Sequence, residues 1–299
     1  MWQIELGCSV LHNSEELEIN IVNRDLTVGN VQITALSDGA LQFDLCSFFP
    51  SISPKQWDPY RDHLVQGPGV RFNLSSYIIR SEGKVILIDT GMGPKPIDDP
   101  NCSFGQLMDD MKATGIRPSD IDMVVMTHLH RDHIGWNVLS EGGFYAPTFP
   151  KARYWVSDKD WDACHQPDIQ PTRFPNAPER VWPLDELDIC EIYEGEHAFT
   201  SEVVSLPTPG HTPGHMSLLI SSQGQRALIL GDVLHNPAQV EETDWVSRAD
   251  MDPRQTRITR SSVLQQIETE GILAVVGHFP APGYGHLIRL EGRRYWQPI

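Results

Sequence analysis

Three histidines and one aspartate crowd into six consecutive positions of VVMTHLHRDHIGWN, residues 124–137. Neutral imidazole and carboxylate groups are ligands that suit zinc and similar divalent ions. In the H-x-H element, alternate residues of an extended chain point the same way, so His128 and His130 can bind one ion. Asp132 and His133, just past the turn, face a second position. The spacing therefore predicts a metal site, although this segment alone does not select its chemistry.

Three further candidate ligands lie at the ends of predicted strands or just beyond them: His211 in TPGHTPGH, Asp232 at the end of ALILGD and His278 at the end of AVVGH. A carboxylate that closes an apolar strand is costly unless it is paired or bound to a metal. Each residue also has an ordinary interpretation: His211 as a loop cap, Asp232 as a helix or turn cap, and His278 as a surface side chain. With the first cluster they supply enough ligands for two metals that share one carboxylate.

Runs of β-branched and alternating residues predict the strands that would position these side chains. The predicted strands cover residues 31–39, 71–81, 84–91, 121–127, 152–157, 202–208, 216–221, 226–232 and 272–278, with two short strands at the C-terminus. Helices are predicted over 103–115, with Ser103 as N-cap and Gly115 closing it, and over 252–271, with Asp252 as N-cap and Gly271 at its end. The segment 165–183 is rich in proline and aromatic residues and is predicted to be a long loop.

This order of strands and helices predicts sheets that pack face to face, with the helices outside. No linker divides the chain. We expect one catalytic domain over residues 29–299, preceded by a polar, acidic N-terminal arm over residues 1–28.

The overall charge limits the partners of the protein. The chain has 23 Lys+Arg against 40 Asp+Glu, a formal net charge of −17, which disfavours a nucleic-acid partner. Five scattered cysteines without a C-x-x-C pair are typical of free thiols in a reducing compartment. The sequence shows no signal peptide and no apolar run near the roughly 20 residues that span a bilayer. We therefore expect a soluble, cytoplasmic protein without a membrane partner.

The segment THLHRDHIG resembles the H-x-H-x-D-H signature of the metallo-β-lactamase superfamily, and the later candidate ligands follow in the order of that family. The resemblance covers about residues 30–297. It implies an α/β fold, an αββα sandwich in which two mixed β-sheets lie face to face with helices on their outer faces. It also implies two divalent ions, with Zn²⁺ the expected metal, at one edge of the sheets.

The resemblance assigns the ligands to two groups: His128, His130 and His211 for one ion, Asp132, His133 and His278 for the other, and Asp232 as the bridge. The segment LIDTG resembles a strand that supports the metal site in this family. Asp89 within it would hydrogen-bond a metal-bound histidine, a role that fixes the orientation of the ring.

Several branches of the family fit the residues poorly. Cysteine-ligand β-lactamases have Cys where this chain has Asp232, and flavodiiron enzymes have Glu where this chain has His130. Nuclease branches are expected to have a basic surface, which a charge of −17 contradicts. A glyoxalase II-like thioesterase remains an open alternative because four arginines lie late in the chain: Arg248, Arg254, Arg257 and Arg260.

The remaining branch contains the acyl-homoserine lactonases and the related organophosphate and aryl-ester hydrolases. The C-terminal GHFPAPGYGHLIRLEGRRYWQP and the N-terminal arm resemble the methyl parathion hydrolase side of this branch. The expected function is the opening of a lactone ring, an N-acyl-homoserine lactone (quorum quenching), through attack by a hydroxide that bridges the metals. Hydrolysis of an organophosphate triester or an aryl ester on the same site is the alternative.

Two residues are candidates for catalytic roles. Well-known lactonases carry a tyrosine three residues after the bridging aspartate, where it donates to the substrate carbonyl oxygen. This chain has His235 at that position, and it is either a donor or a packing residue. Asp132 is expected to steer the nucleophile and to pass its proton to the leaving alkoxide.

Six aromatic residues are candidates for substrate binding: Phe48, Phe49, Trp57 and Tyr60 in one loop, and Phe174 and Trp182 as an opposing wall. Apolar walls around a few polar groups are typical of small-molecule pockets. Each of these aromatics could instead pack its loop onto the body of the protein. As a group they favour a moderately apolar lactone or ester as the partner, and family analogy alone points to a homodimer.

Overall fold

The computed structural model describes residues 24–65, 69–95 and 103–299, and these residues form two seven-stranded sheets and a two-stranded ribbon. The strands of the first sheet, in spatial order, are β1 (Asp25–Val28), β2 (Val31–Asp44), β3 (Gly69–Ser81), β4 (Lys84–Ile88), β5 (Met123–Val125), β8 (Arg153–Ser157) and β9 (Cys190–Tyr193). Those of the second are β10 (Ala198–Thr200), β11 (Val203–Pro207), β12 (Met216–Ser222), β13 (Gln225–Ile229), β14 (Leu273–Val275), β15 (Tyr284–Leu290) and β16 (Arg293–Pro298). The ribbon pairs β6 (Val138–Glu141) with β7 (Phe144–Pro147).

Both large sheets contain parallel and antiparallel neighbours. Strands β4, β5, β8 and β9 pair in parallel, as do β13 and β14, and the other pairs are antiparallel. Parallel neighbours need a crossover connection, and the crossover from β13 to β14 includes helix α8 (Pro253–Glu270).

The remaining helices are short: α1 (Leu45–Phe48), α2 (Leu107–Ala113), α3 (Arg131–Ile134), α4 (Asp158–Cys164), α5 (Gln170–Arg173), α6 (Ala177–Arg180) and α7 (Trp182–Glu186). Four 3-10 segments accompany them: η1 (Pro54–His63), η2 (Pro118–Asp120), η3 (Gly231–Val233) and η4 (Pro237–Val240). No helix in the described ranges is both long enough and apolar enough to cross a membrane.

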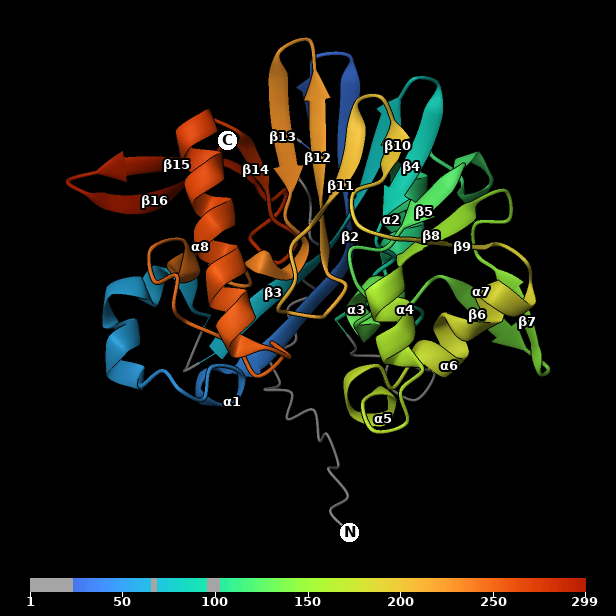
Figure 1. Ribbon diagram of the computed structural model, residues 1–299, viewed down its shortest axis with the longest axis horizontal. Coiled ribbons are helices and arrows are strands. Elements are labelled where there is room, and N and C mark those ends of the chain that lie inside the picture. Colours follow the sequence, from blue (N-terminus) through green and yellow to red (C-terminus); the bar gives the residue numbers. More distant parts are fainter. Residues whose placement is uncertain (1–23, 66–68, 96–102) are drawn as a thin grey trace.

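Three apolar layers hold the sheets and helices together. Between the sheets, Ile33 and Ile86 of the first belong to the same buried cluster as Leu218 and Ile229 of the second. A second cluster lies between the first sheet and helices α2, α4, α6 and α7, and a third lies between the second sheet and α8. Figure 1 shows α8 on one side of the paired sheets and helices α3 to α7 on the other. The predicted αββα sandwich is confirmed.

The two predicted long helices differ in how closely they match. Helix α8 has the expected ends, since the Asp252 side chain accepts bonds from two N–H groups of the first turn and Gly271 adopts φ 63°. Helix α2 is shorter than the predicted range 103–115. Ser103 does not cap it, because its hydroxyl donates to the backbone oxygen of Ala40. A residue of β2 takes this place, because the Asp38 side chain accepts from the Leu107 N–H at 2.8 Å.

The prediction of a loop over 165–183 was wrong. Helices α5 and α6 and the start of α7 lie there, and each has proline in its first turn, where the missing N–H costs nothing. They are too short to show a helical period in the sequence, and buried Phe174, Val181 and Leu184 hold them against the core.

At the other end of the chain, residues 25–28 of the predicted arm form β1, which pairs with β2 and so belongs to the first sheet. Residues 1–23 of the arm lie outside the described residues.

Candidate metal centre

Each candidate ligand follows the end of a buried strand, and both sheets contribute. The segment after β5 carries His128 and His130 and leads into α3, which carries Asp132 and His133. The second sheet supplies the remaining three ligands: His211 after β11, Asp232 in η3 after β13, and His278 after β14. The side chains meet at one edge of the paired sheets, so the structure brings together all seven residues that the sequence singled out.

The ring nitrogens of His128, His130 and His211 point at one another. Nδ1 of His130 lies 2.8 Å from Nε2 of His211 and 3.2 Å from Nε2 of His128. Nε2 of His211 is also 3.1 Å from Oδ2 of Asp232. Such convergence of nitrogen lone pairs is the geometry of a cation site, because a neutral ring has one proton and cannot satisfy several nitrogen neighbours at once.

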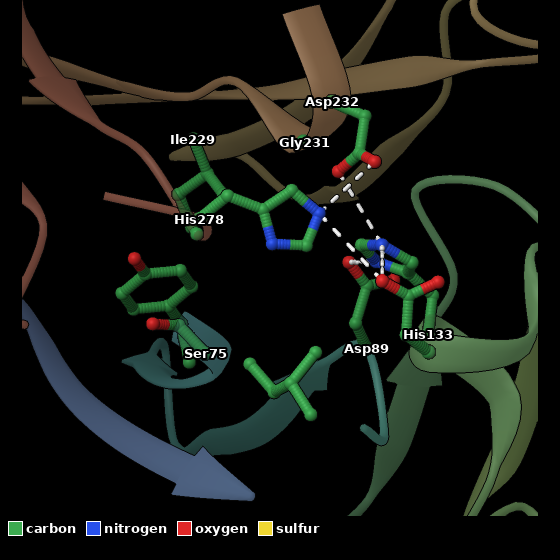
Figure 2. Close-up of a pocket in the computed structure, with 11 residues that line it drawn as sticks. Ser75, Asp89, His133, Ile229, Gly231, Asp232 and His278 are labelled. Atoms are coloured by element: carbon green, nitrogen blue, oxygen red, sulfur yellow. Dashed lines mark hydrogen bonds and ion pairs between the residues drawn. The ribbon is translucent and has the colours of Figure 1, made fainter. Parts of the chain in front are cut away.

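A second group, Asp132, His133 and His278, lies on the other side of Asp232. Nε2 of His133 is 3.3 Å from Oδ1 of Asp232, and Nε2 of His278 is 3.1 Å from Oδ2. Figure 2 shows the His278 ring and the Asp232 carboxylate directed toward one another, with Asp89 beside His133. A void of about 10 Å³ lies among these side chains, close to the volume of one water-sized sphere.

The donor set of both groups fits divalent cations. Imidazole nitrogens and carboxylate oxygens are typical zinc ligands, and Asp232 faces both groups through its two oxygens. Nε2 of His133 is fully buried and has no hydrogen-bond partner within the part of the chain that the structure describes, and a bound cation would supply one. The arrangement offers groups of candidate ligands that share the Asp232 carboxylate.

Hydrogen bonds from outside the ligand set fix three of the rings. Nδ1 of His133 donates to Asp89 at 2.8 Å, Nδ1 of His211 donates to Asp250 at 2.9 Å, and Nδ1 of His278 donates to the Asn73 backbone oxygen at 2.9 Å. Carboxylate and carbonyl oxygens only accept, so these contacts place the proton of each neutral ring on Nδ1 and leave Nε2 free for a cation.

The predicted contact of Asp89 with a ligand histidine is present. Its carboxylate also accepts from the N–H and hydroxyl of Thr127, at 2.8 and 2.7 Å, and so connects the end of β4 to the first ligand loop. Asp250 was not predicted. It lies in an irregular segment 39 residues from His211 in the chain, and no local pattern marks it.

A third buried carboxylate joins the two ligand-bearing loops directly. Asp160 in α4 accepts from the Leu129 N–H at 3.1 Å, between His128 and His130. It also accepts from the Thr212 hydroxyl at 2.9 Å and the Gly214 N–H at 2.6 Å, just after His211. This one side chain therefore connects the loop that follows β5 in the first sheet to the loop that follows β11 in the second.

His215, the second histidine of TPGHTPGH, was also not predicted as part of the site. Burial lowers its pKa to about 3, so the ring is neutral, and Nε2 accepts from the Asp232 N–H at 2.8 Å. Gly231 makes this approach possible, since its φ is 56° and a Cβ there would lie 2.6 Å from Nε2 of His215. The repeated histidine in the motif is the signal that could have revealed this support for Asp232.

The candidate ligand histidines differ in the direction in which their surroundings shift the pKa of the ring. Burial lowers the pKa of every ring, and this effect prevails at His128 and His130, aided by the neighbouring histidines. At His211, the carboxylates of Asp232 and Asp250 overcome burial and raise the pKa to about 9. The pKa values of His133 and His278 are also raised, by Asp232 in the first place.

Asp232 itself remains ionised. Burial opposes its charge, but the surrounding histidines, His278 first among them, hold its pKa well below the usual range. The centre thus pairs an anionic bridge with neutral or proton-binding rings, whose protons a metal cation would displace.

His235 lies against Asp232, with Nε2 3.2 Å from Oδ2, and it is almost fully buried. Neither ring nitrogen has a hydrogen-bond partner among the described residues. Burial lowers its pKa, so the neutral ring keeps one N–H to donate. The ring stacks on His278 and also contacts Phe48. The ring thus packs among aromatic neighbours, and its role as a donor to the substrate stays a prediction.

The six aromatic residues proposed for substrate binding are mostly enclosed. Phe48, Phe49, Trp57 and Tyr60 form one apolar cluster with Phe72 and Trp245. Of the six residues, Phe48 and Phe174 contact site histidines, with ring centroids 5.5 Å from His235 and 5.7 Å from His130. Trp182 stacks on His165 instead. A substrate-binding role for the group stays a prediction.

A profile of the metallo-beta-lactamase superfamily matches residues 69–278. An N-acyl homoserine lactonase of Bacillus thuringiensis is 26% identical over 230 residues, which cover 71% of this chain and 84% of that protein.

Among solved structures, the hydrolase AbOPH of the beta lactamase superfamily has a TM-score of 0.78 at 25% identity, covering 92% of this chain and 96% of its own. AidC, a dizinc quorum-quenching lactonase in complex with a product, has a TM-score of 0.78 at 22% identity with the same coverage. The likeness to AidC shows the fold.

Proposed function

The chain belongs to the metallo-beta-lactamase superfamily of hydrolases, and from that membership we propose that it is a dinuclear zinc-dependent lactonase. The observation that carries the proposal is the position of Asp232 between two groups of nitrogen and oxygen ligands. The 26% identity to an N-acyl homoserine lactonase supports a lactone as the substrate. We infer that an N-acyl-homoserine lactone is hydrolysed, which would make the protein a quorum-quenching enzyme.

Two divalent cations held by these ligands would lower the pKa of a water molecule to about 7 and polarise a substrate carbonyl. The residues of the chain supply the rest. His235 has a buried N–H without a partner beside Asp232, and it donates to the oxygen on which negative charge develops. Asp132 has the most exposed carboxylate of the centre, and its oxygen accepts the proton of the attacking nucleophile and passes it to the leaving alkoxide.

The carboxylates of Asp89 and Asp250 and the backbone of Asn73 hold the histidine rings in place throughout the reaction. Because these contacts come from the protein itself, they limit the reorganisation of the ligand side chains that turnover would need.

An organophosphate or aryl-ester hydrolase on the same centre is the second candidate. The aromatic rings of Phe48 and Phe72 contact His235 at centroid distances of 5.5 and 6.0 Å, and Phe72 contacts His278 at 5.6 Å. An aromatic leaving group would find similar rings near the ligands, and a phenolate needs little help from an acid to depart.

A substrate comparison tests the proposal. Purified protein loaded with zinc is assayed by proton release against N-hexanoyl-homoserine lactone, phenyl acetate and a dialkyl aryl phosphate. We expect the lactone to give the highest kcat/KM, with activity lost on chelation and restored by zinc. Lactone turnover no higher than that of metal-stripped protein would reject the lactonase, and turnover of only the aryl substrates would establish the second candidate.

A further inference from the structure

A cavity of about 320 Å³ adjoins the metal centre, and the ligand His278 forms part of its wall. Its volume lies within the range of small-molecule sites, about 300–1,000 Å³. The lining includes polar residues, Asp62, His63 and Arg71, and apolar residues, Leu64, Val65 and Pro237. The cavity can therefore hold a molecule with a polar group next to an aliphatic chain.

Arg71 is the cationic side chain in the lining of this cavity. Its guanidinium is half-buried, yet it has no hydrogen-bond or ion-pair partner in residues 24–65, 69–95 and 103–299. The side-chain amides of Asn73 and Asn236, which also line the cavity, already donate to the Ser75 hydroxyl and the His63 carbonyl. A guanidinium carries five N–H donors, and those of Arg71 stay partly open to solvent, so a ligand with an acceptor oxygen can bind them in place of water.

The backbone of β3 connects Arg71 to the metal centre. Asn73 accepts from Nδ1 of His278 at 2.9 Å and donates its N–H to the His278 carbonyl at 3.3 Å. Arg71 precedes Asn73 by two residues on the strand, so both side chains lie on one face, and both line the cavity. A substrate that is cleaved beside His278 could therefore extend to Arg71.

We propose that Arg71 binds the amide carbonyl of an N-acylated lactone while the acyl chain lies against Leu64, Val65 and Pro237. This inference rests on the proposed lactonase function and names the part of the substrate that the enzyme recognises. A neutral carbonyl fits better than a carboxylate, because Asp62 lines the same cavity and the chain has a formal charge of −17.

The test compares two lactones that differ in the amide. N-hexanoyl-homoserine lactone carries it, and a γ-lactone with an alkyl substituent of similar length does not. Arg71→Met removes the donors but keeps most of the side-chain volume. Arg80→Met, at the exposed end of the same strand, is the matched control. Zinc content and the thermal unfolding midpoint are measured for each protein to show that the centre and the fold are intact.

We expect Arg71→Met to lower kcat/KM for the amide-bearing lactone by about 10- to 100-fold, the loss expected for one hydrogen bond to a charged group. The alkyl lactone should be hydrolysed as by the wild type, and Arg80→Met should change neither rate. An equal effect of Arg71→Met on the two lactones, or none, would overturn the role of Arg71 and leave the lactonase standing. Absence of lactone turnover by the wild type would overturn the proposed function and this inference with it.

Discussion

The carboxylate of Asp250 lies 2.9 Å from Nδ1 of His211, and both side chains are buried. Asp250 also accepts from the N–H and hydroxyl of Ser247, so the carboxylate is held from its own loop. It fixes the ring of a metal ligand without entering the set of ligands, and the tautomer it imposes directs Nε2 of His211 toward Asp232.

Replacing Asp250 by alanine should therefore weaken cation binding. We expect a 10- to 100-fold loss of zinc affinity at the group containing His211, which is the usual effect of removing such a partner. Titration with zinc in the presence of a competing chelator measures it. Asp244→Asn, an exposed change in the same segment, is the control. Unchanged affinity in Asp250→Ala would show that the contact does not tune the site.

Removal of single ligands should separate the two cation positions. His130→Ala takes one ligand from the first group, and we expect it to lose about one zinc equivalent and nearly all activity. Asp232→Ala removes the shared carboxylate and should lose more zinc than His130→Ala. Metal analysis by atomic emission gives the stoichiometry. His286→Ala, a half-buried histidine of β15 outside the centre, should keep both metal and activity. Full activity of His130→Ala would remove that residue from the mechanism.

His235→Phe keeps a ring in the packed position but removes the N–H. If His235 stabilises the oxyanion, kcat should fall by about 10²- to 10³-fold, with zinc content unchanged. His235→Gln, which retains a donor, should recover part of the loss. Steady-state kinetics and metal analysis on the same preparations decide the point. An unchanged kcat would make His235 a packing residue, and a lost zinc equivalent would make it a ligand.

Glu268 in α8 connects that helix to the terminal β15–β16 hairpin through ion pairs with Arg289 and Arg294. Hydrogen bonds from these arginines, Arg289 first, lower its pKa from 4.5 to about 2. Since the folded-state pKa lies below the unfolded value, this stabilisation is complete above about pH 4.5 and is lost as the pH falls toward 2.

Glu268→Gln should thus lower the free energy of unfolding at pH 7 by about 1 kcal/mol, the scale of solvent-screened pairs. The difference from the wild type should vanish as the pH falls through that window. Urea unfolding at several pH values measures it, with exposed Glu186→Gln as control. A difference that persists at pH 2 would contradict the ion-pair explanation.

The convergence of the seven candidate ligands could be predicted from the sequence for a physical reason. Each ligand follows a strand whose apolar residues are visible in the sequence, and buried polar groups at such positions need partners. The ends of α8 were predictable for the same kind of reason, because Asp252 and Gly271 act locally.

The features that were missed depend on contacts between distant parts of the chain. Asp38 accepts a hydrogen bond from the first turn of α2, and Asp160 joins two loops from different sheets. No local pattern in the sequence marks either residue. The short helices between residues 170 and 186 are stabilised by the burial of residues such as Phe174, not by an internal period. Burial of the aromatic residues also follows from the tertiary arrangement. The sequence therefore could not show which of them line a substrate pocket and which pack in the core.

The division of the ligands between the two sheets has a consequence for how the protein is made. The half of the chain that emerges first from the ribosome carries His128 to His133 but lacks Asp232, the carboxylate that both groups share. Neither half alone is a complete chelator, so the centre arises only when the second sheet docks on the first. The candidate centre is therefore complete only after His278 has been synthesised and the second sheet has packed against the first.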